Sequence, residues 1–144
     1  MEKTAFAAVL AALSLCAAQA QYVVVPVPTV DQAHQHLAFM FSKYQVKYLV
    51  WYGPGTHDYY RGYGAYYSGS GCISEFGTDP ATRAFGVDWS KISSVRDVGN
   101  GIVYAGGELV RASSGRQLRG FHLYLADTRS GRSVANALEV LQTA

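Results

Sequence analysis

The chain has 144 residues, of which 49% are hydrophobic, and 12 Lys or Arg against 10 Asp or Glu give a net charge of +2. This length suits a single domain with one hydrophobic core. The basic excess is confined to residues 83–132 and is far weaker than the charge of a nucleic-acid-binding surface, so we expect no nucleic-acid partner.

The first twenty residues have the pattern of a signal peptide. Lys3 precedes an almost unbroken run of small apolar residues from 5 to 18, and Ala18-Gln19-Ala20 matches the A-x-A pattern that signal peptidase recognises. The run is shorter than the roughly 20 apolar residues that span a membrane. We therefore expect cleavage near Ala20 and one exported domain, residues 21–144, that is periplasmic or secreted and has no transmembrane span.

Cleavage would leave a single cysteine, because Cys16 lies in the signal peptide and only Cys72 follows it. A lone cysteine cannot form an internal disulfide. Free cysteine is among the most buried residue types, so we expect Cys72 in the core, with a free or intermolecular thiol as the alternative.

The first elements after the signal peptide are an extended segment, a helix and a strand. Residues 22–28 (YVVVPVP) contain two prolines, which restrict them to an edge strand or a leader. A helix is expected over about 29–44, where Thr29 and Gln32 match a capping box and apolar residues recur every three or four positions. Residues 45–52 (QVKYLVWY) predict a buried strand.

The second half of the chain predicts strands separated by turns and one closing helix. Apolar residues alternate with polar residues or glycine, and the Asn-Gly pair at 100–101 is typical of a tight hairpin. After a turn at 127–131, an amphipathic helix is expected over about 133–142. The expected strands are residues 72–76, 85–89, 92–98, 102–105, 108–112 and 118–126.

Strands bracketed by two helices predict the α+β class, with a bent, mainly antiparallel sheet. Residues 84–144 also carry the sequence VDWSKI before a strand, the Asn-Gly hairpin, two further strands and the closing helix SVANALEVLQ. In these features they resemble the pleckstrin-homology-like (PH-like) domains. The resemblance implies a scaffold that usually binds peptides or lipid headgroups and rarely catalyses a reaction.

Metal-ligating and catalytic residue types occur without a recognisable arrangement. His34 and His36 are two positions apart on a predicted helix and point about 200° apart, so they cannot share an ion. Cys72, His57 and Asp58 have the residue types of a thiol triad, but no local signature of a thiol enzyme accompanies them. We expect no metal, no cofactor and no enzyme activity; a small exported hydrolase with a Cys or Ser nucleophile is an alternative.

The segment 57–72 (HDYYRGYGAYYSGSGC) is the most unusual part of the chain. Seven of the eleven tyrosines fall between Tyr48 and Tyr67. Tyrosine offers a large contact area and a hydroxyl group, which favours it in binding surfaces. Three interpretations remain open: a binding surface, a strand pair or lid that packs on the sheet, and a flexible loop.

The predicted role is therefore non-catalytic binding or structure through this Tyr/Gly-rich segment. The partner would be a protein, a peptide or a small ligand, and self-association as a homo-oligomer is the alternative. In a strand, Tyr59, Arg61 and Tyr63 would share one face and Tyr60 the other. The candidate binding residues are Trp51, Tyr59, Tyr60, Arg61, Tyr63, Tyr66 and Tyr67.

Overall fold

A computed structural model describes residues 28–111 and 115–144. The predicted signal peptide, the extended segment up to residue 27 and the end of the strand predicted at 108–112 lie outside these residues. The helices are α1 (Val30–Lys43) and α2 (Thr128–Thr143), and the strands are β1 (Val46–Trp51), β2 (Tyr59–Gly64), β3 (Tyr66–Ser70), β4 (Ile73–Asp79), β5 (Thr82–Gly99), β6 (Ile102–Arg111) and β7 (Gln117–Tyr124).

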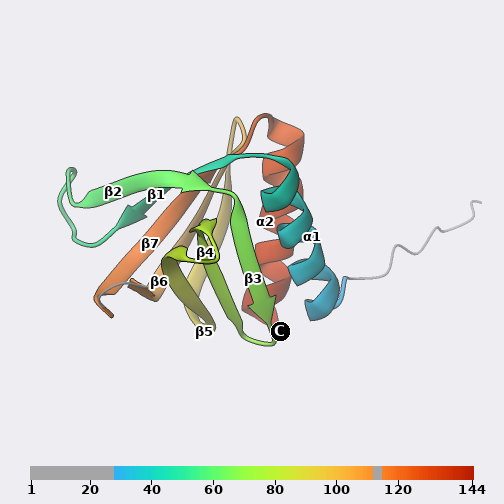
Figure 1. Cartoon of the computed structure of the whole chain (residues 1–144), viewed down its shortest axis with the longest axis horizontal. Helices are drawn as coiled ribbons and strands as arrows, with labels where there is room; N and C mark the ends of the chain where they lie inside the picture. Colours follow the sequence, from blue (N-terminus) through green and yellow to red (C-terminus); the bar gives the residue numbers. More distant parts are fainter. Residues whose placement is uncertain (1–27, 112–114) are drawn as a thin grey trace, which may run out of the picture.

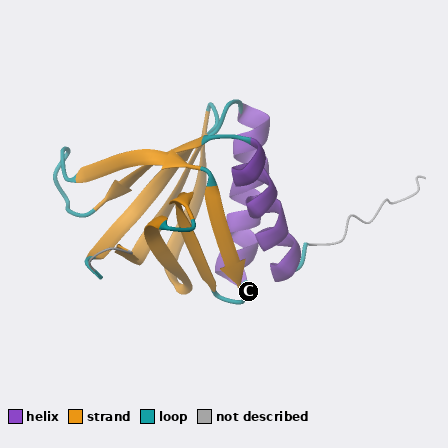
Figure 2. Ribbon diagram, viewed as in Figure 1, coloured by secondary structure: helices purple, strands orange, loops and turns teal. Residues whose placement is uncertain are grey.

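The molecule has two layers, which confirms the predicted α+β class. Seven strands form one strongly curled antiparallel sheet, and α1 and α2 lie together on one side of it (Figures 1 and 2). The expected N-terminal helix begins where its capping box places it, since the Thr29 hydroxyl accepts from the Gln32 amide and the Gln32 side chain accepts from the Thr29 amide.

The strand order of the sheet is β2-β1-β7-β6-β5-β4-β3, and every pairing is antiparallel. Neighbours in this order are also neighbours in sequence, except for β1 and β7. An odd number of strands cannot close into a ring through antiparallel pairs alone, because the two end strands run in the same direction. The sheet therefore has a seam between β2 and β3.

The Tyr/Gly-rich segment 57–72 forms both sides of this seam. It is neither one loop nor one hairpin, because β2 and β3 are the two end strands of the sheet and only Ala65 separates them. The Ala65 amide donates to the Gly77 carbonyl at 3.1 Å, and the Thr78 hydroxyl donates to the Tyr63 carbonyl at 3.0 Å. These bonds attach the bend between β2 and β3 to β4.

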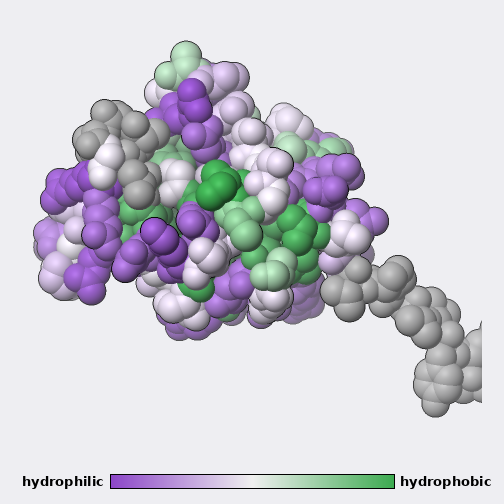
Figure 3. All heavy atoms as spheres, turned by 90° about the horizontal axis from the view of Figure 1, so that it is seen from below, coloured by the Kyte–Doolittle hydropathy of each residue, from purple (hydrophilic) through white to green (hydrophobic). Residues whose placement is uncertain are grey.

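The core lies inside the curl of the sheet and beneath the helices. Its centre is an aromatic cluster in which the rings of Phe76 and Phe85 stack at 4.8 Å and those of Phe85 and Phe121 lie 4.9 Å apart. Leu37 of α1 and Leu138 of α2 are fully buried against the sheet. On the underside of the molecule, the hydrophobic side chains of the described residues gather in a limited central area among hydrophilic ones (Figure 3).

The second helix is longer than its sequence pattern indicates. We expected a turn at 127–131 and a helix from Ser133, but α2 begins at Thr128 with Asp127 as its N-cap, whose carboxylate accepts from the Ser130 amide at 2.7 Å. This hydrogen bond and the bond to the Ser130 hydroxyl lower the pKa of Asp127. Gly131, which suggested a turn, is helical because it packs directly on Gly101 of the β5–β6 hairpin.

Two pairs of predicted strands are each one continuous strand. Residues 85–89 and 92–98 belong to β5, and residues 102–105 join the following segment in β6 through Gly106 and Gly107. The pairing of β5 with β6 shifts register between Val87 and Ile92, so β5 is irregular here but unbroken. The Asn-Gly hairpin is confirmed: Asn100 and Gly101 have φ of 55° and 79°.

The expectation that Cys72 is buried is wrong. The residue is exposed in the two-residue turn between β3 and β4, after Gly71, whose φ is +58°. Its backbone still contributes to the fold, because the Cys72 carbonyl accepts from the Trp89 amide at 2.8 Å. The turn position outweighs the general tendency of free cysteine to be buried.

Candidate binding site

A groove of about 910 Å³ lies on the outer face of the sheet. It crosses β1, β7, β6 and β5 on the side opposite the core. Its lining consists of Trp51, Tyr52, Gly53, Pro54, Ser93, Ser94, Arg96, Tyr104, Gly106, Gly107, Glu108, Gln117, Leu118, Arg119 and His122. The groove therefore joins residues from the second half of the chain to the end of β1.

The floor of the groove is a row of glycines. Trp51 of β1 lies opposite Gly120 of β7, which lies opposite Gly106 of β6. A Cβ atom at Gly106 would come within 2.6 Å of the Tyr104 hydroxyl oxygen, and one at Gly120 within 2.9 Å of it. The absence of side chains at both positions lets the Tyr104 ring lie over the sheet.

One wall of the groove is the next cross-strand row. His122 of β7 lies opposite Tyr104 of β6, and Tyr104 lies opposite Arg96 of β5. The rings of His122 and Tyr104 are 4.8 Å apart, and the Arg96 guanidinium lies 5.0 Å from the centre of the Tyr104 ring. This stacked row fixes an aromatic surface with a cation at its end.

Trp51 and His122 are joined by a hydrogen bond that determines the protonation of the imidazole. The Trp51 Nε1–H donates to His122 Nδ1 at 3.1 Å. Indole is only a donor, so Nδ1 must be unprotonated and the proton of the neutral ring lies on Nε2. Burial lowers the pKa of His122, and the positive charge of Arg96 lowers it further. The site therefore holds a neutral imidazole that donates through Nε2.

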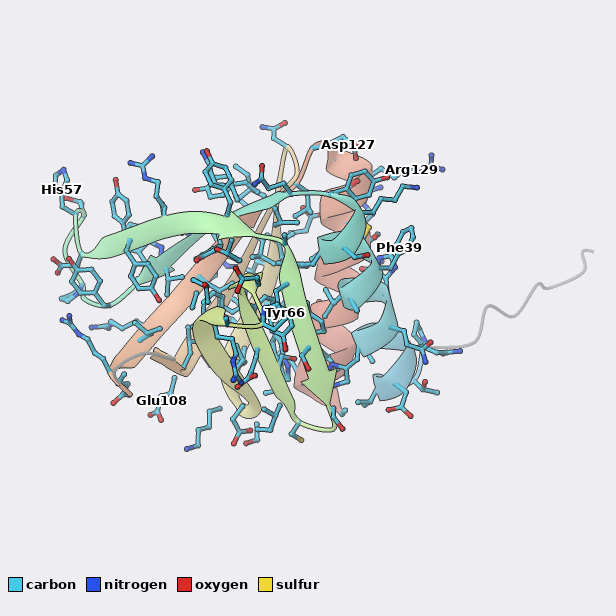
Figure 4. The ribbon with its side chains drawn as sticks, in the orientation of Figure 1. Phe39, His57, Tyr66, Glu108, Asp127 and Arg129 are labelled. Atoms are coloured by element: carbon cyan, nitrogen blue, oxygen red, sulfur yellow. The ribbon has the colours of Figure 1, made fainter. Side chains whose placement is uncertain are left out.

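The charges at the groove are mainly positive. Arg96 and Arg119 line it together with one carboxylate, Glu108, which is labelled in Figure 4. Beside the groove, the Arg116 guanidinium stacks 4.5 Å from the centre of the Tyr52 ring. Guanidinium groups near aromatic rings suit a ligand that combines an anionic group with a flat apolar face.

Four of the seven predicted binding residues share the outer face. Trp51 packs edge-on against Tyr59 at 5.1 Å between ring centres, and the Arg61 guanidinium lies 5.7 Å from the centre of the Tyr59 ring. Tyr63 continues along the same face and is 55% exposed. The predicted alternation of β2 is confirmed, since Tyr60 faces the other way and its hydroxyl donates to the Ala84 carbonyl at 3.4 Å.

Tyr66 and Tyr67 lie away from Trp51, so the seven predicted residues do not form one surface. Both belong to β3, at the opposite end of the strand order. Tyr66 is half-buried (Figure 4), and Tyr67 is buried with only 7% of its surface exposed. Tyr67 packs between Phe41 of α1 and Phe76 of β4, which makes it a core residue.

The Tyr67 hydroxyl is part of a buried chain of hydrogen bonds. It lies 2.6 Å from His34 Nδ1 and 2.7 Å from the Ser74 hydroxyl, which accepts from Trp89 Nε1–H at 2.7 Å. At the other end, His34 Nε2 lies 2.8 Å from the Gly71 carbonyl. Burial raises the pKa of Tyr67, and its hydrogen bond to Ser74 offsets part of that rise.

The direction of every bond in this chain follows from its two ends. The Gly71 carbonyl only accepts, so His34 Nε2 carries a proton, and in the neutral ring Nδ1 then accepts from Tyr67. Tyr67 in turn accepts from Ser74, which accepts from Trp89. Each buried polar group is satisfied, so the chain has a structural role in joining α1 to β3, β4 and β5.

The residues of the thiol-triad hypothesis are not brought together. His57 lies at the tip of the β1–β2 loop, whereas Cys72 lies in the β3–β4 turn at the opposite end of the molecule (Figures 1 and 4). Asp58 instead accepts from the Gly55 amide at 2.9 Å and organises its own loop. Across residues 28–111 and 115–144, no three His, Cys, Asp or Glu side chains are grouped to hold a metal ion.

Sequence reasoning missed the residues that build the groove with Trp51, namely Tyr104, His122 and Arg96. The Asn-Gly pair predicts the β5–β6 hairpin, but a register shift between Asp97 and Gly99 is what places Arg96 opposite Tyr104, and this shift has no local signal. The approach of Trp51 to His122 depends on the pairing of β1 with β7, for which the sequence has no local signal.

No protein-family model, no curated protein and no solved structure matches the chain. Within the described part of the chain, neither helix has the length and apolar character needed to cross a lipid bilayer.

Proposed function

We propose that the protein is an exported, non-catalytic binding domain and that its ligand lies in the outer groove between Trp51 and Arg96. The observation that carries this proposal is the aromatic row on a glycine floor. A tyrosine ring held over two glycines, beside an indole and a neutral imidazole, forms a preformed platform, and the polar side chains around it can fix the orientation of a ligand. Rings that served only to fill the core would be buried, whereas these rings line an open groove.

The ligand class that fits best is an acidic oligosaccharide. A pyranose ring presents a flat face of C–H groups that can stack on Trp51 or Tyr104. A uronic-acid carboxylate can accept from Arg96 or Arg119, which lie on the same groove. Sugar hydroxyls can form hydrogen bonds with the Ser93, Ser94 and Gln117 side chains. The lining therefore has a partner for each chemical feature of this ligand.

The sequence-based expectations agree with a binding role, and two of the residues they name enlarge the binding surface. Tyr59 and Arg61 continue the outer face beyond Trp51, which makes room for a ligand longer than one sugar. The resemblance of residues 84–144 to PH-like scaffolds also supports binding over catalysis. The hydrolase alternative has less support, since His57 and Cys72 lie at opposite ends of the molecule.

The test compares one charged and one neutral oligosaccharide of the same linkage. Oligo-β-1,4-glucuronate and the matching cello-oligosaccharide are titrated into the protein, with calorimetry and tryptophan fluorescence as readouts. We expect a dissociation constant of about 10–100 µM for the charged probe and about tenfold weaker binding of the neutral one. Trp51→Ala should weaken both probes by tenfold or more, on the order of 1.4 kcal/mol.

Removal of single cations separates the charge contribution from stacking. Arg96→Gln should weaken the charged probe alone, whereas Lys43→Gln, which removes a cation from α1 beside Phe39, should change neither. Failure of both probes to bind would refute the saccharide proposal. Binding of the charged probe that survives Trp51→Ala would show that the groove is not the site.

A further inference from the structure

The free edge of β2 has backbone groups that point away from the sheet. The Tyr52 amide donates to the Asp58 carbonyl at 2.9 Å, while the Asp58 amide donates to Gly55, so Tyr52 and Asp58 occupy a hydrogen-bonded position at the start of the β1–β2 ladder. In an antiparallel ladder such pairs alternate with non-bonded pairs. The uninterrupted register then directs the N–H and C=O groups of Tyr59, Arg61 and Tyr63 outward.

One end of this edge has a hydrogen-bond partner within the described residues. The Tyr63 carbonyl accepts from the Thr78 hydroxyl, close to the bend at Ala65. Because β2 ends the strand order, Tyr59 and Arg61 pair with β1 on one side and have no paired strand on the other side among the described residues. Figure 1 shows this part of β2 extending away from β3 and the helices toward the β1–β2 loop.

The edge also has few of the features that usually block pairing with another chain. Natural edge strands are protected by proline, by bulges or by several charges. The segment 59–63 (YYRGY) has no proline, its register with β1 has no bulge, and Arg61 is its one charge. An exposed edge of this kind is a template for a further strand.

We propose that β2 pairs antiparallel with β2 of a second copy of this chain, about a two-fold axis at Tyr60. In this register Tyr59 lies opposite Arg61 of the second copy, and both residues have outward backbone groups, so they form hydrogen-bonded pairs. Their side chains share the outer face, where Arg61 already stacks on Tyr59 within one chain. The edge is therefore self-complementary, with a tyrosine facing an arginine twice.

Other registers of the same edge are less favourable. An axis at Arg61 would place two arginines directly opposite each other, and like charges in that position destabilise a strand pair. An axis nearer Tyr63 would use a carbonyl that already accepts from Thr78. The axis at Tyr60 avoids both and joins the outer faces of two copies into one continuous surface.

The first test is the mass of residues 21–144 in solution as a function of concentration, measured by sedimentation equilibrium without any saccharide. We expect a monomer–dimer equilibrium with a dissociation constant between about 1 and 100 µM. A monomeric mass at every concentration up to about 1 mM would overturn the proposal and leave the edge to a different partner. Since no saccharide is present, this outcome is independent of the groove.

The second test removes the outward N–H of the edge. Arg61→Pro deletes a donor that does not bond to β1, so the β1–β2 ladder keeps its hydrogen bonds. It should weaken dimerisation at least about tenfold, whereas Arg61→Gln, which keeps the donor, should weaken it less. Circular dichroism establishes that both variants fold; equal dimerisation of Arg61→Pro and wild type would contradict the proposal.

The third test reads the register directly by cross-linking in a Cys72→Ser background. Tyr60→Cys places two thiols opposite each other in a non-hydrogen-bonded pair, where the Cα separation of about 4.5 Å permits a disulfide. Tyr63→Cys is the control, because its side chain is exposed but lies opposite His57 of the second copy. Efficient cross-linking at residue 60 and little at residue 63 is expected, and the reverse would exclude this register.

Discussion

At the scale of single residues, His122, which accepts from Trp51 in the groove, makes the stability of the fold depend on pH. Burial and the charge of Arg96 lower the pKa of His122 in the folded state. The unfolded chain takes up this proton near pH 6.5 while the folded chain resists it. The contribution of His122 to stability is therefore present above about pH 6.5 and is lost as the pH falls below it.

The substitution His122→Gln should reduce this dependence on pH. Glutamine can still accept from Trp51 through Oε1 but does not titrate. Urea unfolding at pH 7.5 and 5.5 should show a smaller loss of midpoint in the variant than in wild type. His57→Gln, in the exposed loop, serves as the control and should behave as wild type. An unchanged loss in His122→Gln would show that His122 titrates equally in both states.

Tyr67, whose hydroxyl is buried, is the second residue whose contribution to stability can be measured. Tyr67→Phe keeps the ring between Phe41 and Phe76 but leaves His34 Nδ1 without its partner. The cost of an unsatisfied buried polar group is about 1–3 kcal/mol of unfolding free energy, which guanidinium titration measures. Tyr66→Phe should change stability by less than about 0.5 kcal/mol; equal effects would remove the assigned role of the chain.

At the scale of elements, α2 depends on close contact with the β5–β6 hairpin. Gly131 has no room for a side chain, since a Cβ atom would lie 2.7 Å from the Gly101 Cα atom. Gly→Ala in a helix interior normally stabilises by about 1 kcal/mol. Gly131→Ala should instead destabilise by about 1–3 kcal/mol, because backbone must move.

Thermal unfolding checks this expectation. The control is Asn136→Ala on the exposed face of α2, which should raise stability by a few tenths of a kcal/mol. A stabilised Gly131→Ala variant would mean that α2 can move away from the hairpin without cost.

Elements with strong local signals were predictable, and those that depend on distant contacts were not. The capping box of Thr29 and Gln32 placed the start of α1 correctly, and the Asn-Gly pair placed the hairpin. The first turn of α2 has no local signal, because Gly131 disfavours a helix and is helical here only through its contact with Gly101. The tyrosines of 57–72 divide between surface and core because side chains alternate along β2 and because the chain crosses the seam at Ala65.

At the scale of the whole molecule, the seam requires a defined spacing between β2 and β3. One additional residue after Gly64 would exchange the two faces of β3 and turn Tyr67 out of the core. Insertion of a single glycine there should cost at least about 3 kcal/mol or prevent cooperative unfolding in urea. The same insertion after Pro54, in the β1–β2 loop, should be tolerated; similar costs at both sites would contradict the role of the spacing.

The strand order also has a consequence for the time course of folding. Every pairing except one joins consecutive strands, so most of the sheet can form from contacts that are close in sequence. Such local contacts favour fast folding. β1 and β7 are the first and last strands in sequence, so their pairing must wait for the last strand. A pulse-labelled exchange experiment should therefore find that the β1 amides that bond to β7 are protected last, after those that bond to β2. The groove beside Trp51 would form only with this last pairing.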